Sequence, residues 1–305
     1  MNAPASSQEA DRGRLMRLAT YAAVATACTL IVVKLAAWVL TDSVALLSTL
    51  IDSTLDAAAS FVNLVAVRHA LQPADQEHRF GHGKAEPLAG LGQAAFIAGS
   101  ALFLIIEASG RVFNPVPVTR GEVGIGVMLF SIALTIALVA FQKRVVAKTD
   151  SVAVGADSLH YAGDVLINIS VIVSIALATL FGLHWLDPLF AIGIAGYLLY
   201  NAAGVFRGSF DLLMDREFPD EDRTAIRAIA TAHPEVRNMH DLRTRSAGHY
   251  GFIQLHLEMD PRITLARAHA ISDEVEAQIR AAFPHAEVII HQDPAGIQEE
   301  HPTFG

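Results

Sequence analysis

The stretch SVALLSTLIDSTLDAAASFVNLVAVRH, residues 43–69, decides what kind of fold this chain adopts. A helix needs about 20 predominantly apolar residues to cross a hydrocarbon core about 30 Å thick, and this run is longer than that. Its only acidic residues are Asp52 and Asp56, and its first basic residue is Arg68. The stretch therefore predicts a membrane helix that carries two carboxylates inside the bilayer.

Five more stretches of this kind predict an α-helical membrane protein with six transmembrane helices. The composition agrees, because 52% of the residues are hydrophobic, only 17% are charged and the mean hydropathy is +0.40. These values exclude disorder, collagen and a coiled coil, and a single cysteine, Cys28, excludes an internal disulfide. The predicted spans are Leu15–Leu40, Ser43–His69, Glu86–Phe113, Val123–Phe141, Val152–Phe181 and Leu186–Val205.

Basic residues in the short connections predict the orientation of these helices. The side predicted to face out has only Arg111 and Arg120. By the positive-inside rule both termini are expected in the cytoplasm, with residues 1–14 as a cytoplasmic tail and residues 15–215 as the membrane domain. The residues on the cytoplasmic side are Arg12, Arg14, Arg17, Arg68, Arg79, Lys84, Lys143, Arg144, Lys148, Arg207 and Arg216.

The last part of the chain has the pattern of a small soluble domain. Residues 216–305 hold 15 acidic against 9 basic residues, and 8 of the 13 histidines, so nucleic acid is not an expected partner. Residues 216–293 are predicted to form a cytoplasmic, metallochaperone-like α+β domain of order αββαβ, and residues 294–305 a disordered tail. Its predicted elements are a helix from Pro219 to about His233, strands Met239–Ser246 and Tyr250–Asp260, helix Thr264–Phe283 and strand Glu287–Asp293.

Ionisable residues inside two predicted membrane helices indicate a metal site. Asp52 and Asp56 in the second helix, and His160 and Asp164 in the fifth, are each spaced i, i+4 and so share a helical face. Charges at membrane depth are costly, which favours a shared purpose. Three carboxylates and an imidazole suit Zn2+, although bonds between helices are the alternative. Asp157 is expected nearer the solvent.

A second candidate site lies in the loop between the second and third helices. Asp75, His78 and His82 fall within eight positions, which is close enough for one metal ion, and a solvated loop is the alternative. The adjoining Gly81-His82-Gly83-Lys84 lacks the first glycine and the Ser or Thr of a P-loop, so no nucleotide is expected to bind.

The histidines of the C-terminal domain suggest further metal binding. Period two in the strand Tyr250–Asp260 puts His256 on the polar face. His291 and Asp293 share a face of the last strand, and Gln292 points the other way unless the strand has already ended there. With His240 and His269 these residues are enough for one or two sites, although surface or core histidines are the alternative. Exposed positions are expected for His233, His249, His285 and His301.

Taken together, these motifs resemble those of the cation diffusion facilitator family over nearly the whole chain. The motifs are Asp52-Ser-Thr-Leu-Asp56, Leu71-Gln-Pro-Ala-Asp75, His78-Arg-Phe-Gly-His82-Gly-Lys84-Ala-Glu86, Leu159-His160-Tyr161 with Asp164, His240-Asp-Leu-Arg-Thr-Arg245 and Ile289-Ile-His291-Gln-Asp-Pro294.

The resemblance implies a homodimer in the inner membrane that exports a divalent cation, Zn2+ with Cd2+ or Fe2+ as further candidates, in exchange for protons by alternating access. It implies a secondary transporter and not an enzyme. It implies a salt bridge between Lys84 and Asp215 at the dimer interface. It also implies three sites: Asp52, Asp56, His160 and Asp164 for transport; Asp75, His78 and His82 in the loop; and His240, His256, His269, His291 and Asp293, with Gln292 as an extra ligand, in a binuclear regulatory site.

Two other functions remain compatible with intramembrane metal ligands. A passive cation channel would more naturally use rings of carbonyls or carboxylates than a tetrahedral set. An intramembrane metalloprotease would need a general base, and His160 is not accompanied by an HExxH sequence.

Overall fold

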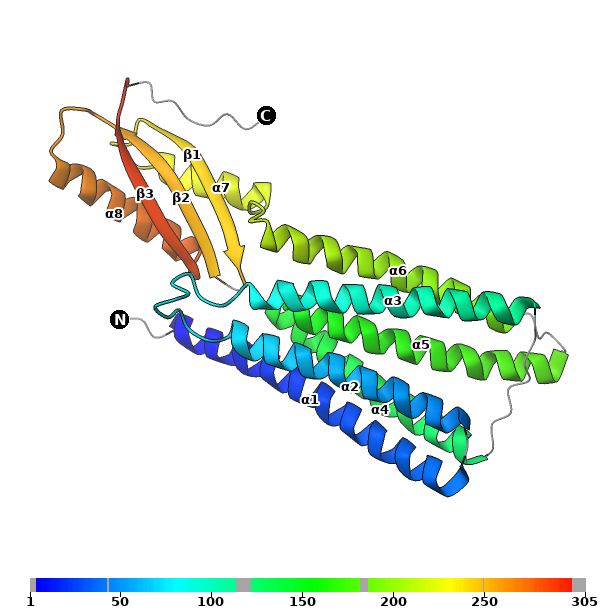
Figure 1. Ribbon diagram of the computed structural model, residues 1–305. Coiled ribbons are helices and arrows are strands. Elements are labelled where there is room, and N and C mark those ends of the chain that lie inside the picture. Colours follow the sequence, from blue (N-terminus) through cyan, green and yellow to red (C-terminus); the bar gives the residue numbers. More distant parts are fainter. Residues whose placement is uncertain (1–3, 43, 114–121, 182–185, 249, 298–305) are drawn as a thin grey trace. The chain divides into compact units, whose positions relative to one another are not determined.

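The computed structural model describes residues 4–42, 44–113, 122–181, 186–248 and 250–297 (Figure 1). The chain divides into two compact units. One unit contains residues 7–73 and 85–210, and the other contains residues 1–6, 74–84 and 211–305. The loop of residues 74–84, which connects the second and third helices, therefore belongs with the C-terminal unit and not with the helices on either side of it.

Six long helices form the first unit and confirm the predicted helical membrane domain. Three of them are longer than hydropathy predicted, α1 at its start and α4 and α6 at their ends. Hydropathy marks only the part of a helix that suits hydrocarbon, whereas the hydrogen-bonded helix continues into polar sequence such as Gln142–Lys148. The helices are α1 (Pro4–Thr41), α2 (Val44–Ala70), α3 (Ala85–Phe113), α4 (Glu122–Thr149), α5 (Val152–Phe181) and α6 (Leu186–Leu213).

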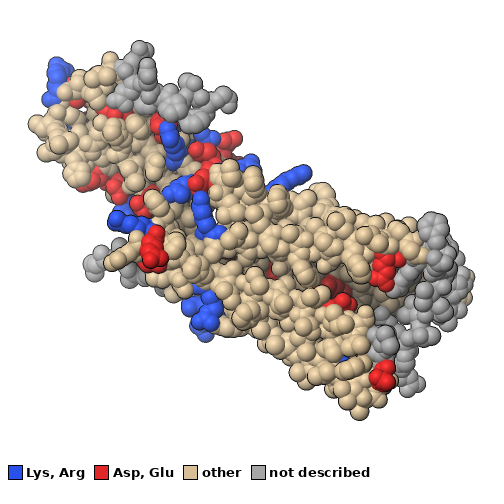
Figure 2. All heavy atoms as spheres, in the orientation of Figure 1, with Lys and Arg blue, Asp and Glu red and all other residues tan. Residues whose placement is uncertain are grey.

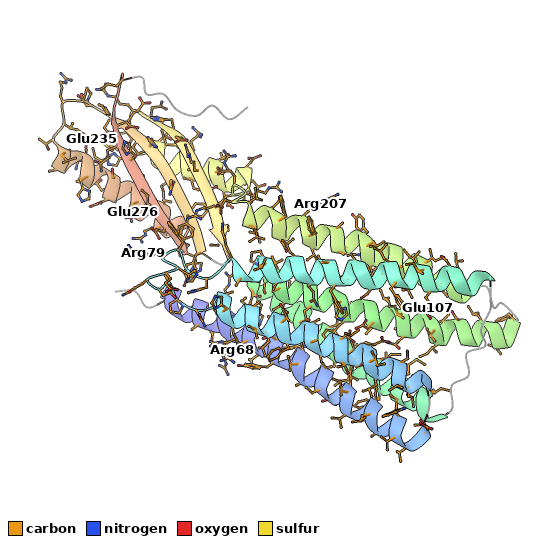
Figure 3. All side chains as sticks on the ribbon, viewed as in Figure 1. Arg68, Arg79, Glu107, Arg207, Glu235 and Glu276 are labelled. Carbon is orange, nitrogen blue, oxygen red and sulfur yellow. The ribbon has the colours of Figure 1, made fainter. Side chains whose placement is uncertain are left out.

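Within the described residues, five of these helices are long and apolar enough to cross a bilayer: α1, α2, α3, α4 and α6. The remaining helix, α5, has 30 residues, which is also long enough, and it carries Asp157, His160 and Asp164. The bundle surface in Figure 2 is largely uncharged, as lipid contact requires. In Figure 3, Arg68 and Arg207 lie toward one end of the bundle and Glu107 lies toward the other.

Small residues allow the helices to approach one another closely. Ala19, Ala23 and Ala27 lie four residues apart on α1 and are buried. A Cβ added to Gly163 of α5 would lie 2.7 Å from Leu198 Cδ2 of α6, so a larger residue there would require the Leu198 side chain to move. Such close packing is the main attraction between helices in lipid, where no hydrophobic driving force acts between them.

The C-terminal unit contains the predicted αββαβ order. Its elements are α7 (Asp220–Thr231), β1 (Asn238–Ala247), β2 (Tyr250–Met259), α8 (Leu265–Ala282) and β3 (Ala286–Pro294). The sheet order is β1-β2-β3, with β1 antiparallel and β3 parallel to β2. Thr264 caps α8, because its side chain accepts a hydrogen bond from the N–H of Arg267. The predicted disordered tail lies mostly outside the described residues.

One face of this sheet packs against both helices. Ile253, Leu255, Leu257 and Met259 alternate along β2 and are at most 2% exposed. They form a core with Ile226 and Ala230 of α7, and with Ile271, Val275 and Ile279 of α8. The predicted alternation of β2 is therefore confirmed, and the opposite face of the sheet is left for polar residues.

Candidate metal centres

The first candidate centre lies between α2 and α5. Asp56, His160 and Asp164 each place one ligand atom within 4.8 Å of the other two. His160 Nε2 lies 3.0 Å from Asp56 Oδ1 and 3.8 Å from Asp164 Oδ2. Ligand atoms about 2.1 Å from a tetrahedral Zn2+ stand about 3.4 Å apart, so both separations need only small adjustments to bind an ion.

The imidazole of His160 is buried and packed against an aromatic ring. Its side chain is 6% exposed, whereas those of Asp56 and Asp164 are 21% and 32% exposed. The ring of Phe96 on α3 meets the imidazole edge to face, with 5.3 Å between the ring centres. The nitrogen ligand is therefore fixed in the protein interior, and the two carboxylates lie on the more open side.

The fourth predicted ligand, Asp52, stands apart from this group. It is exposed, and it lies one turn along α2 from Asp56, about 6 Å along the helix axis. Lys34 of α1 lies beside it, because Lys34 Nζ donates hydrogen bonds to Ser53 Oγ at 2.6 Å and to the Thr49 carbonyl at 3.1 Å. The structure thus brings together three of the four predicted residues.

The second candidate centre is the loop of residues 74–84. Asp75 Oδ1 lies 3.4 Å from His78 Nδ1, and Asp75 Oδ2 lies 3.4 Å from His82 Nε2. Asp75 Oδ1 also accepts the backbone N–H groups of His78 and Glu77. The hydrogen bond from the His78 N–H is the main cause that lowers the pKa of the Asp75 carboxyl. All three predicted residues lie close together in this loop, and the lowered pKa favours the ionised form of Asp75.

Packing against the C-terminal domain fixes the shape of this loop. Phe80 stacks edge to face on Phe252 of β2, and the Arg245 guanidinium lies over both rings, 4.8 Å and 4.6 Å from their centres. A Cβ on Gly83 would lie 2.1 Å from the Ala247 carbonyl oxygen, so the approach requires glycine. The loop that carries His78 and His82 therefore packs directly against the β1–β2 hairpin.

The predicted ion pair between Lys84 and Asp215 is present in this unit. Lys84 Nζ donates to Asp215 Oδ1 at 2.9 Å, and Arg245 lies 3.7 Å from the same oxygen. Both side chains of the Lys84 pair are more than a third exposed. An exposed pair contributes little stability by itself, so its value lies in orientation.

The third candidate centre occupies the polar face of the sheet. His256 Nδ1 lies 2.8 Å from Asp293 Oδ2, and His240 Nε2 lies 3.3 Å from the same oxygen. His291 Nε2 lies 3.1 Å from the other oxygen, Asp293 Oδ1. The Asp293 side chain is only 5% exposed. One buried carboxylate thus stands between three imidazoles, which is an arrangement able to bridge two metal ions.

Strand register explains how these residues meet. His240 is paired with His256, and His256 with His291, across the three strands. A bulge follows His240, where Asp241 has φ 45° and its carboxylate holds Arg243 through two hydrogen bonds. The two hydrogen bonds raise the pKa of Arg243. The bulge lets β1 keep His240 on the polar face before the strand continues.

Two predicted residues of the third centre lie elsewhere in the single chain. Gln292 is in register with Leu257, the buried residue that faces the helices, and so it stands on the opposite face from Asp293. His269 is on α8, 70% exposed, with its nearest acidic partner, Asp273, 3.6 Å away on the same helix. Neither residue joins the group formed by His240, His256 and Asp293.

Two expectations about polar residues are wrong. His233 is buried and not exposed, because the chain folds back after α7 and its Nδ1 accepts the Glu235 N–H while its Nε2 meets Glu274 of α8. Asp157 was expected near solvent, yet it is 0% exposed and bonded to three other helices. The position of Asp157, one turn before His160 in an apolar helix, is the feature of the sequence that could have indicated its burial.

The remaining histidines that were expected to be exposed are not decided in the same way. His285 is half-buried, and His249 and His301 lie outside the described residues.

Comparison with known proteins identifies a family for both parts of the chain. The model of the cation efflux transmembrane domain matches residues 20–214, and the model of the cytoplasmic domain of cation efflux proteins matches residues 218–295. The chain is similar to the cation-efflux pump FieF of Klebsiella pneumoniae, with 48% identity over 285 residues, 93% of this chain and 95% of the relative. It is equally similar to FieF of Cronobacter sakazakii, with 48% identity over 94% of this chain and 95% of the relative.

Among solved structures, the zinc form in a study of the putative zinc transporter CzrB is 32% identical. The matched region covers 28% of this chain and 99% of that structure, with a TM-score of 0.27. One family model matches the membrane helices and the other matches the domain that begins with α7. The similarity to the FieF relatives extends over nearly all of the chain. The chain is a member of the cation diffusion facilitator family.

Proposed function

We propose that this protein exports a divalent metal cation, with Zn2+ as the main candidate and Cd2+ or Fe2+ as others, and that it exchanges the ion for protons. The observation that carries the proposal is the group of Asp56, His160 and Asp164 between two membrane helices. Efflux is supported by the relatives at 48% identity, which are named cation-efflux pumps and are transporters rather than enzymes.

The ligand types favour a borderline cation. An imidazole nitrogen suits zinc, iron or copper, whereas carboxylates alone suit magnesium, calcium or manganese. With Asp52 as a fourth ligand, the site would offer three oxygens and one nitrogen. We propose that Asp52 completes the site when the ion enters, since it shares the face of α2 that carries Asp56.

Coupling to protons follows from the chemistry of these ligands. A metal ion binds to deprotonated carboxylates and neutral imidazole, so metal and protons compete for the same atoms. A site that opens alternately to the two sides of the membrane would take up metal on one side and exchange it for protons on the other. In this scheme both termini are cytoplasmic, the membrane is the bacterial inner membrane, and the inward proton gradient drives export.

The other two centres are proposed to regulate transport. The loop group of Asp75, His78 and His82 lies on the C-terminal domain, where it would respond to cytoplasmic metal. The Asp293 group lacks His269 within one chain, and the exposed His269 and His291 would complete a binuclear site in a homodimer. Metal binding would then draw two C-terminal domains together, with the Lys84–Asp215 pair at the boundary between subunits.

The proposed function is tested by metal flux in proteoliposomes with a pH dye on the side opposite the metal. Wild type is expected to move zinc and protons in opposite directions, and Asp164→Ala to stop both. Zinc movement without proton movement would contradict antiport and favour a channel, and unchanged zinc movement in Asp164→Ala would contradict the assigned site. Ser131→Ala is a matched control, because within the described part of the chain Ser131 Oγ donates its hydrogen bond to the Val127 carbonyl of its own helix.

A further inference from the structure

A second polar contact joins α2 and α5 next to the intramembrane metal group. Asp157 is three residues before His160 on α5, and Ser60 is four residues after Asp56 on α2. Ser60 Oγ lies 3.3 Å from Asp157 Oδ1, and Asn63, further along α2, donates to the Ala153 carbonyl. Together with the contact between Asp56 and His160, these contacts move backward along α5 as they move forward along α2. The two helices therefore run antiparallel and make polar contacts at successive turns.

The side chains that surround Asp157 are all buried. Asp157 and Gln142 are 0% exposed, Ser60 and Tyr161 are 1% exposed, and Gln93 is 6% exposed. A carboxylate in such a place is stable only if its oxygens are hydrogen-bonded, so the loss of a donor to it is costly.

The donors to Asp157 come from three other helices. Gln142 Nε2 of α4 donates to Asp157 Oδ2 at 2.7 Å. Ser60 of α2 and Gln93 of α3 both donate to Asp157 Oδ1, and the Gln93 distance is 3.4 Å. One carboxylate therefore ties α5 to α2, α3 and α4 at a single level of the bundle.

The direction of each hydrogen bond follows from the donors available. A serine hydroxyl has one proton, and Ser60 gives it to Asp157. The Tyr161 hydroxyl, 2.8 Å from Ser60 Oγ, must then donate to Ser60. The chain of bonds runs from Tyr161 through Ser60 to Asp157, and it orients Tyr161, the neighbour of His160 in sequence.

We propose that Asp157 is a positioning residue of the intramembrane metal site. Its bonds set the axial register and rotation of α5 against α2, so that His160 meets Asp56. A shift of α5 by a single residue amounts to about 1.5 Å along the axis and about 100° of rotation, which would carry the imidazole away from the carboxylate. This inference rests on the proposed function, because it concerns the same metal site.

The test is the KM for zinc flux in proteoliposomes of full-length Asp157→Leu. Leucine is close to aspartate in size and accepts no hydrogen bond, so the contacts to Ser60, Gln93 and Gln142 are all lost. Loss of a group that supports a metal ligand costs about 10- to 100-fold in metal affinity, and a KM rise of that size is expected. A residue that merely holds the bundle together would lower the amount of folded protein and the maximal rate and leave KM unchanged, and that result would overturn the inference.

The conservative variant Asp157→Asn separates the hydrogen bonds from the charge. Its amide oxygen would still accept from Ser60 and Gln93, and Gln142 can turn its own amide so that its oxygen accepts from the new NH2 group. We expect its KM to stay close to wild type and well below that of Asp157→Leu. A KM in Asp157→Asn as high as in Asp157→Leu would contradict positioning through these contacts. Ser131→Ala should keep the wild-type KM.

Two further variants keep the test decisive. If Asp157→Leu does not fold, Gln142→Leu and Gln93→Leu each remove one donor and leave the carboxylate, and wild-type KM in both would overturn the inference. Asp56→Ala in the same vesicles identifies which claim has failed. Flux that persists in Asp56→Ala would contradict the metal site itself, whereas an inactive Asp56→Ala with a wild-type KM in Asp157→Leu would contradict only the positioning role.

Discussion

His160 Nε2 lies 3.0 Å from Asp56 Oδ1, a contact that joins α5 to α2 across 104 positions of sequence. The imidazole is almost completely buried, whereas the carboxylate is partly open. A nitrogen ligand in a fixed place and carboxylates on a more open side are suited to capture and release of an ion.

His160 is predicted to set the choice of metal. In His160→Asp the site would have only oxygen ligands, which favours harder cations such as Mn2+ over Zn2+. The ratio of zinc flux to manganese flux should fall about tenfold, which corresponds to about 1.4 kcal/mol. Competition between the two ions in proteoliposomes measures this ratio, and an unchanged ratio would show that another group selects the ion.

Lys34 is predicted to weaken metal binding at the neighbouring site. Its ammonium donates to Ser53 beside Asp52, and it interacts electrostatically with Asp52 and Asp164. Removal of this charge in Lys34→Met should tighten zinc binding by roughly tenfold, since charges inside a protein are weakly screened. The control is Lys148→Met, because Lys148 is exposed at the end of α4. Equal zinc affinities in the two variants would contradict the prediction.

The fold class was predictable because its signals are local. Apolar runs predict membrane helices, and period two along β2 predicts which face of the sheet is buried. The spacing of Asp52 with Asp56, and of His160 with Asp164, also indicates which two helices carry the candidate intramembrane site. Each of these inferences depends only on residues within a few turns of one another.

The contacts between distant segments could not be predicted in this way. No spacing in the sequence shows that Gln93, Gln142 and Ser60 converge on Asp157, because their helices are joined only by tertiary packing. His233 illustrates the same limit, since its burial depends on Glu274 of a helix about 40 residues away. The position of Asp52 outside the metal group likewise depends on how α2 is rotated against α5.

Gly83 is predicted to control how the loop lies on the β1–β2 hairpin. In Gly83→Ala the new Cβ would collide with the Ala247 carbonyl, a backbone atom that cannot move aside easily. Overpacking of this kind costs about 1–3 kcal/mol, so the melting temperature should fall and zinc binding by His78 and His82 should weaken. In Gly92→Ala the Cβ would meet no described atom within 4 Å beyond the backbone of its own helix, and no loss is expected. Similar thermal unfolding of both variants would count against this account of the loop.

Glu235 is predicted to stabilise the C-terminal domain while its carboxylate is ionised, and to lose this effect in acid. The hydrogen bond from Arg267 lowers the pKa of Glu235, so folding favours the ionised carboxylate. The stabilisation is present above the unfolded-state pKa, about 4.3, and is lost as the pH falls through the lower folded-state value. Glu235→Gln should therefore melt slightly below wild type at pH 7, and the difference should shrink as the pH falls below 4. A difference that grows in acid would have the wrong sign.

The most direct test of the central claim is zinc binding to a full-length chain in which the loop and C-terminal centres are disabled by His82→Ala and His256→Ala. Calorimetry in buffers of different ionisation enthalpy gives both the number of zinc ions bound and the protons released. We predict one zinc ion per chain with proton release, and loss of both when Asp56→Ala is added. Zinc binding that persists unchanged after Asp56→Ala, or that releases no protons, would contradict a proton-exchanging metal site between α2 and α5.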